Sequence, residues 1–118
     1  MKAVLRIRRD TEAVLAGMGK RFTAAWRAGK SSAHVFTFES PSALFRVLTP
    51  KRWEILERLQ RLGPSSLRGL ARSLERDVKR VHEDVSVLID IGLIAKTERG
   101  QVHVPFTVIE ADFELRAA

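Results

Sequence analysis

Cysteine is absent from this chain of 118 residues, which excludes disulfide bonds, thiolate metal sites and a cysteine nucleophile. Since disulfides belong to oxidising compartments, this composition favours a cytoplasmic protein. Long apolar runs are also missing: no stretch approaches the roughly 18 residues that a membrane helix needs, so we expect no membrane association. The basic first ten residues, which include Arg6, Arg8 and Arg9, are not followed by an apolar run, and we do not expect a signal peptide.

Acidic side chains are fewer than basic ones, with 14 Asp and Glu against 21 Lys and Arg. The resulting net charge of +7 attracts polyanions, of which nucleic acid is the commonest. The excess is not uniform, because residues 41–100 hold twelve basic and eight acidic side chains, whereas residues 101–118 hold one and three. Hydrophobic residues make up 45% of the chain, enough for a folded core. The sequence therefore predicts a basic globular protein whose last segment lies outside any basic surface.

The two ends of the chain predict a small αβ appendage. Alternating apolar and polar residues indicate strands over residues 3–8, 34–39 and 109–115. Between the first two strands, Asp10 can cap a helix that runs to about Ala28. The apolar stripe of that helix contains the residues that we expect to form a dimer interface: Leu15, Met18, Phe22 and Trp26. We expect the last strand to pair with the first, since its acidic residues would then face arginines; the sequence does not say whether this happens within one chain or between two.

The middle of the chain predicts helices followed by a hairpin. Capping residues that precede apolar residues at helical spacing indicate helices over residues 41–48, 50–62, 66–74 and 77–91. The predicted inward face of the last helix consists of Val78, Val81, Val85, Leu88 and Ile89. Two short strands over residues 93–97 and 101–104 are separated by Glu98, Arg99 and Gly100, which is typical of a β-hairpin.

Three helices followed by a β-hairpin are typical of a winged helix-turn-helix, here within an α+β fold. We expect this DNA-binding domain over residues 40–105, the dimerisation appendage over residues 1–39, and the strand that pairs with it within residues 106–118. A major groove admits one helix, which a neighbouring helix must hold at a fixed angle. The helix over residues 77–91 would enter the groove, and the helix over residues 66–74 would support it.

The predicted DNA-binding residues belong to the two last helices, the link between them and the hairpin. The first two turns of the longer helix would face base edges, because Arg and Lys pair with guanine O6 and N7 and a glutamate accepts from cytosine N4. Basic residues elsewhere would reach phosphate or, from the hairpin, the minor groove. The full set is Ser66, Arg68, Arg72, Arg76, Lys79, Arg80, His82, Glu83, Lys96 and Arg99. Structural roles remain open for some of them, since a serine can cap a helix and Glu83 can pair with Lys79 or Arg80.

Two runs of the sequence, FESPSALFRVLTPKRWEIL over residues 38–56 and LARSLERDVKRVHEDV over residues 70–85, resemble a known family. It is a family of small prokaryotic predicted transcriptional regulators related to the MarR-type winged helix proteins, and the resemblance covers about residues 36–106. Members are often encoded beside a small toxin and resemble the antitoxins of TumE-type pairs. The resemblance therefore implies a DNA-binding antitoxin that represses its own operon. Glu75 stands where the family often has glycine, and Gly69 where it often has an acidic residue.

Enzymatic patterns are not found in the sequence. His82-Glu83 lacks the second histidine of a metalloprotease helix, and the other two histidines are scattered. The stretch from Gly17 to Lys20 lacks the upstream glycine of a phosphate-binding loop, and Arg21 replaces the Ser or Thr that such a loop needs. We expect no catalytic residues, no metal site and no cofactor.

The leading hypothesis is a homodimeric repressor that binds double-stranded DNA at a roughly palindromic operator, because two-fold symmetry doubles the contacts of a single helix-turn-helix. A second hypothesis is an antitoxin that binds and neutralises a toxin protein and regulates its own operon. A third is a binder of double-stranded or structured RNA that uses the same basic surface. Competition between DNA and RNA duplexes, and co-purification of a protein partner, would separate the three.

Overall fold

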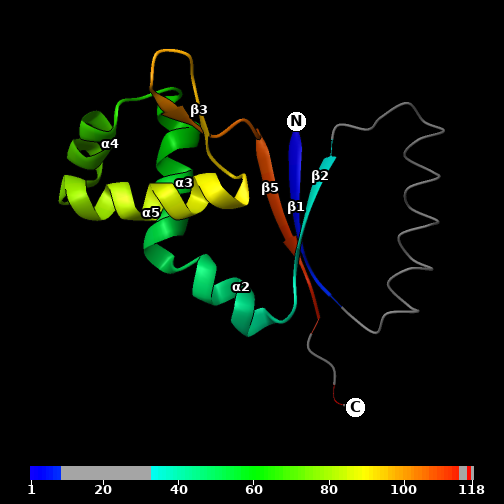
Figure 1. Ribbon diagram of the computed structural model, residues 1–118. Helices are drawn as coiled ribbons and strands as arrows, with labels where there is room; N and C mark the ends of the chain where they lie inside the picture. The colour runs from blue at the N-terminus through cyan, green and yellow to red at the C-terminus, as the bar shows by residue number, and fades with distance from the viewer. Residues whose placement is uncertain (9–32, 115–116, 118) are drawn as a thin grey trace. The chain divides into compact units, whose positions relative to one another are not determined.

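The computed structural model describes residues 1–8, 33–114 and 117. These residues form a small α+β fold with four helices and five strands (Figure 1). They belong to two compact units, Arg46–Thr107 and a unit that takes in Met1–Phe45 and Val108–Ala118. The predicted helix over residues 10–28 lies outside the described residues, and so do the predicted dimer residues Leu15, Met18, Phe22 and Trp26.

The unit formed by the chain ends contains a three-stranded parallel sheet with the order β2-β1-β5. Its strands are β1 (Lys2–Ile7), β2 (Ala33–Phe38) and β5 (Val108–Asp112). β1 is the middle strand and pairs with β2 on one side and with β5 of the same chain on the other. Along the sequence, the whole Arg46–Thr107 unit lies between β2 and β5. The pairing of the last strand with the first is the one that the charge pattern favours, and the register places Arg6 opposite Asp112.

The middle strand is more buried than its sequence pattern suggests. Alternation places Val4 on the same face as Arg6 and Arg8, yet Ala3, Val4 and Leu5 are all buried. Such continuous burial is typical of the strands of a parallel sheet, whereas alternation is typical of an antiparallel one. The edge strand β5 differs, because its residues are mostly exposed. One ion pair, Lys2 Nζ to Glu110 Oε2 at 3.1 Å, joins β1 to β5, but both side chains are nearly half exposed and such pairs stabilise little.

The helices begin and end where local capping signals predict, to within one residue. They are α2 (Pro41–Val47), α3 (Pro50–Leu62), α4 (Leu67–Leu74) and α5 (Val78–Ile91). In the Arg46–Thr107 unit, α3, α4 and α5 pack against one another, with α5 running across α3 (Figure 1). Their shared core contains the buried residues Ile55, Leu56, Leu59, Leu70, Ala71, Val81, Val85 and Leu88.

A short hairpin follows α5. It consists of β3 (Ala95–Lys96) and β4 (Val102–His103), and both strands are shorter than predicted. The first strand begins late because Leu93 and Ile94 lie buried in the turn after α5. Ser65 adds a bridge on the other side of β4, through Ser65 N–H to Val102 O at 3.0 Å and Val102 N–H to Ser65 O at 2.8 Å. These bonds attach the hairpin to the segment that leads into α4.

Helices α4 and α5 end in turns of the same hydrogen-bonding type, but the residue in the left-handed conformation differs between them. After α5, Gly92 has a φ of 98°, and the N–H groups of Gly92 and Leu93 bond back to Ile89 O and Leu88 O. After α4, Glu75 takes the left-handed position with a φ of 54°, and the equivalent bonds run from Glu75 and Arg76. A residue with a Cβ is strained in this conformation, which glycine adopts freely.

Replacing Glu75 with glycine is therefore expected to stabilise the protein by about 0.5 to 1 kcal/mol, since the relief of left-handed strain exceeds the extra chain entropy of glycine when unfolded. Urea denaturation would measure the gain. Glu75→Ala is the matched control, because it removes the same charge but keeps the Cβ and should show no comparable gain. Equal stability of the glycine and alanine variants would contradict the strain argument.

Candidate nucleic-acid interface

Helix α5 separates an apolar face from a charged one. Asp77 caps the helix by accepting a hydrogen bond from the Arg80 N–H at 3.3 Å, which begins the helix at Val78. Val81, Val85 and Leu88, at spacings of four and three residues, are fully buried. The side of α5 opposite these residues therefore faces away from the core.

The predicted base-reading residues lie on this outward part of α5. Lys79, Arg80, His82 and Glu83 are all exposed. The first turn of α5 contains two basic residues and no acidic one, although the partial positive charge of a helix N-terminus favours acidic side chains there. The start of α5 therefore presents two exposed cations beside the carboxylate of Asp77 that caps the helix.

The predicted phosphate-contacting residues extend the basic surface of the same unit. Arg68 and Arg72 are exposed on α4, and Lys96 and Arg99 are exposed on the hairpin. Ser66 has a structural role, because its Oγ accepts a hydrogen bond from the Gly69 N–H at 3.0 Å and caps α4. The hydroxyl is exposed, but its oxygen already accepts a hydrogen bond from the backbone of α4.

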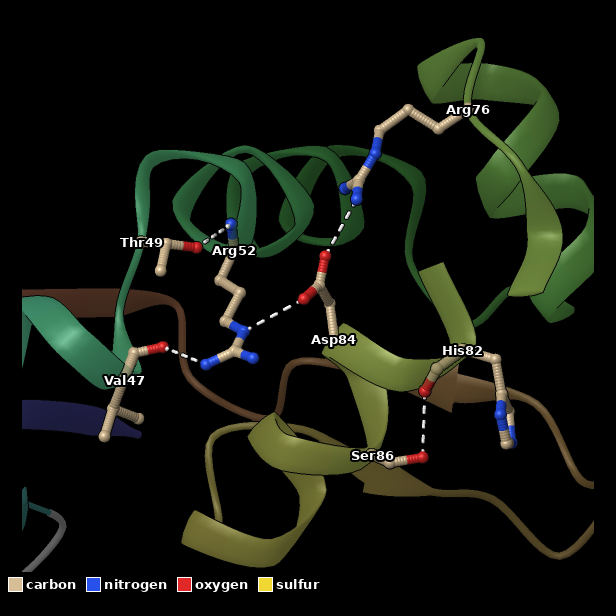
Figure 2. A network of polar contacts seen from close by, with 7 residues as sticks. All are labelled: Val47, Thr49, Arg52, Arg76, His82, Asp84 and Ser86. Atoms are coloured by element: carbon tan, nitrogen blue, oxygen red, sulfur yellow. Dashed lines mark hydrogen bonds and ion pairs between the residues drawn. The ribbon is translucent and has the colours of Figure 1, made fainter. Parts of the chain in front are cut away.

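Arg76 differs from the other predicted cations because its side chain turns inward. Its Nη2 donates to Asp84 Oδ2 at 2.8 Å, and its side chain is only 15% exposed (Figure 2). Nη1 is buried and has no hydrogen-bond partner among the described residues. Since this guanidinium is already neutralised by a carboxylate, we do not count Arg76 among the groups available to phosphate.

Asp84 is the centre of a charged network that joins three parts of the unit (Figure 2). Its other oxygen, Oδ1, accepts from Arg52 Nε of α3 at 3.0 Å, and Arg52 Nη1 donates to Val47 O at 2.8 Å. Burial by itself would raise the pKa of Asp84, but the hydrogen bonds and charges of Arg76 and Arg52 outweigh it, so the pKa is lowered from its ordinary value of 3.8. Asp84 therefore links α5 to α3 and to the α4–α5 turn as a stable anion.

Sequence reasoning did not identify Arg52 and Asp84 as important residues. A signal was present, because Asp84 shares the helical spacing of the buried Val81, Val85 and Leu88. A carboxylate at such a position needs a cationic partner. The partner itself was not evident, since Arg52 lies 32 residues earlier in the chain.

Two further residues of α5 also differ from the simple helical pattern. Val78, predicted on the inward face, is 41% exposed, because at the first helical position the core does not reach it. Ser86, which does not belong to the predicted inward face, is nevertheless only partly exposed, and its Oγ donates to His82 O at 2.8 Å. The His82 ring points away from the Asp84 network and is exposed (Figure 2).

Two searches of the described part of the chain bear on other classes of site. Among residues 1–8, 33–114 and 117, no group of three or more His, Asp or Glu side chains is arranged to hold a metal ion. In the same part of the chain, no helix has the length and apolar character required to cross a membrane.

Comparison with known proteins identifies one family. Residues 47–111, which include α3, α4, α5, the hairpin and most of β5, match the model of the HVO_A0114 family. No curated protein and no solved structure matches the chain significantly.

Proposed function

This chain belongs to the HVO_A0114 family, and we propose that it is a sequence-specific DNA-binding transcriptional regulator that acts as a homodimeric repressor. The observation that carries the proposal is the first turn of α5, where the side chains of Lys79 and Arg80 are exposed and make no hydrogen bond or ion pair within the described residues. This arrangement disfavours the helix by about 0.3 to 1 kcal/mol per cation at low salt. A bound polyanion would interact favourably with both cations and so offset this unfavourable interaction.

In this proposal α3, α4, α5 and the β3–β4 hairpin form a winged helix-turn-helix. Three features support this assignment: α4 and α5 are joined by only Glu75, Arg76 and Asp77, α5 buries a continuous apolar stripe, and a hairpin follows directly. The outward face of α5 would enter the major groove, α4 would hold it there, and the hairpin would form the wing.

The exposed charged residues of the predicted interface then have defined tasks. Lys79 and Arg80 would donate to guanine O6 and N7, and Glu83 would accept from cytosine N4, with His82 beside them. Four cations flank this region and would contact phosphates: Arg68, Arg72, Lys96 and Arg99. Phosphate contacts would position the helix, and contacts with base edges would provide sequence preference.

A homodimer would place two such helices on the two halves of a palindromic site, which is how single helix-turn-helix domains reach useful affinity. The appendage is the proposed dimer interface. If all four flanking cations of each protomer contact phosphates, the dimer neutralises about eight, and the logarithm of its affinity falls with the logarithm of salt concentration with a slope near −7.

The test is fluorescence anisotropy of the full chain against a labelled fragment of its own upstream DNA, with a random DNA of the same length as control, across a salt series. We expect a preference of at least about a hundredfold for the upstream DNA and a steep loss of affinity as salt increases. An RNA duplex of the same sequence serves as competitor, and it should compete poorly.

Weak binding that is equal for both DNAs would contradict the proposal. In that case the antitoxin hypothesis, in which the main partner is a toxin protein encoded nearby, would be tested next by co-expression and co-purification. An RNA duplex that competes as well as DNA would instead identify the basic surface as an RNA-binding one.

A further inference from the structure

Val78 is an unusual residue for its place in the fold. It occupies the first position of α5 and is 41% exposed, whereas Val81 and Val85 of the same helix are 0% and 1% exposed. A β-branched residue is also a weak helix former, so neither burial nor helix propensity accounts for valine at this position. The exposed methyl groups of Val78 are thus available to a ligand.

The surroundings of Val78 limit what that ligand can be. Lys79 and Arg80 follow it in the same turn, and both are exposed cations, whereas Asp77 before it is the helix cap. Successive side chains of a helix point about 100° apart, so the three residues do not share a face, but they lie within one turn at the end of the helix that a groove would meet first. An apolar protein surface does not suit two neighbouring cations, whereas DNA combines negative phosphates with a small apolar group on one base edge.

We propose that Val78 is a specificity-determining residue that contacts the C5-methyl group of a thymine in the major groove, next to the base pairs read by Lys79 and Arg80. This inference rests on the proposed function, because it requires α5 to enter the groove. The thymine methyl is the one apolar group that base edges present in the major groove. The Asp77 cap, with its bond to the Arg80 N–H, holds Val78 at the start of the helix, where recognition helices meet base edges.

The test begins with a duplex that the full-length protein enriches from a random-sequence pool. Each thymine of that duplex is then replaced with uracil, which pairs identically but lacks the methyl group. For the natural protein, we expect one thymine in each half-site to matter, with a loss of about fourfold per half-site when its methyl is removed. Thymines elsewhere in the duplex are the internal control.

The variant Val78→Ala should bind the thymine and uracil duplexes equally, because it lacks the methyl groups that make the contact. Val78→Ile keeps a branched apolar side chain and should retain the preference for thymine. Alanine is a better helix former than valine, so loss of the preference in Val78→Ala cannot be attributed to loss of α5. Thermal denaturation of each variant would verify this.

The outcomes separate the inference from the function on which it rests. If no duplex is enriched, the proposed function itself fails. If a duplex is enriched but Val78→Ala retains the same thymine-to-uracil difference as the natural protein, the protein is a specific DNA binder and the role of Val78 is overturned. A site whose half-sites contain no thymine would overturn it equally.

Discussion

Replacing Lys79 and Arg80 together with alanine is expected to lower the affinity for the specific DNA site by at least about a hundredfold and to abolish the preference over random DNA. The expectation follows from the exposure of both side chains in the first turn of α5. Each good contact with a base edge contributes about 1 to 3 kcal/mol of discrimination, and 1.4 kcal/mol corresponds to a factor of ten. A dimer loses the contacts of two half-sites.

This change should leave the fold intact. Within the described residues neither side chain makes a hydrogen bond or an ion pair, and the Asp77 cap binds the backbone of residue 80 rather than its side chain. Alanine is the best helix former, and the removal of cations from a helix N-terminus is favourable. The free energy of unfolding should therefore stay constant or increase by up to about 1 kcal/mol, which urea denaturation would measure.

The matched control is Lys51→Ala with Arg61→Ala, which removes two exposed cations from α3 and so produces the same change of net charge. It should weaken binding to specific and random DNA by a similar, small factor. If this control reduced the preference as strongly as the Lys79 and Arg80 substitutions, the effect would be one of total charge, and the assignment of α5 as the reading helix would fail.

Asp84→Asn is expected to destabilise the Arg46–Thr107 unit by about 2 to 4 kcal/mol, a large part of the stability of a small domain. The substitution removes the carboxylate that neutralises Arg52 and Arg76, whose side chains are only 20% and 15% exposed. An amide also presents hydrogen-bond donors to two groups that can only donate. Because Arg76 Nη1 already lacks a partner among the described residues, no second acceptor compensates.

Asp90→Asn is the control for this measurement. Asp90 lies on the same helix but is exposed and near its C-terminus, where loss of a negative charge is neutral or slightly favourable. Urea denaturation at pH 7 should show a change below about 0.5 kcal/mol for this variant. A similar small change in Asp84→Asn would mean that the network contributes little to the fold.

The pH dependence of stability provides an independent check on Asp84. Because its pKa is lowered in the folded protein, the network contributes fully above the ordinary value of 3.8 and is lost as the pH falls through the folded value. The natural protein should therefore lose stability between about pH 5 and pH 2 more steeply than Asp84→Asn. Parallel curves for the two proteins would contradict the lowered pKa.

The elements of the Arg46–Thr107 unit could be predicted from the sequence because the signals that start and stop them are local. Thr49 and Asp77 each cap a helix by bonding to an N–H three residues later, and Gly92 ends α5 in a left-handed turn. These interactions need no distant partner, so the residues that make them are close together in the sequence. The exposure of Lys79 and Arg80 followed from the same local periodicity.

Other properties depended on residues far apart in the chain. The sequence by itself determined where α2, α3, α4 and α5 lie, which face of α5 is apolar and that basic residues outnumber acidic ones. Only the tertiary structure decided that Arg76 bonds to Asp84 and is withdrawn from the basic surface, that Val4 is buried, and that Val78 is exposed at the start of its helix. The reason is physical: capping and periodicity act over one turn, whereas burial and ion pairing depend on which distant segments the fold brings together.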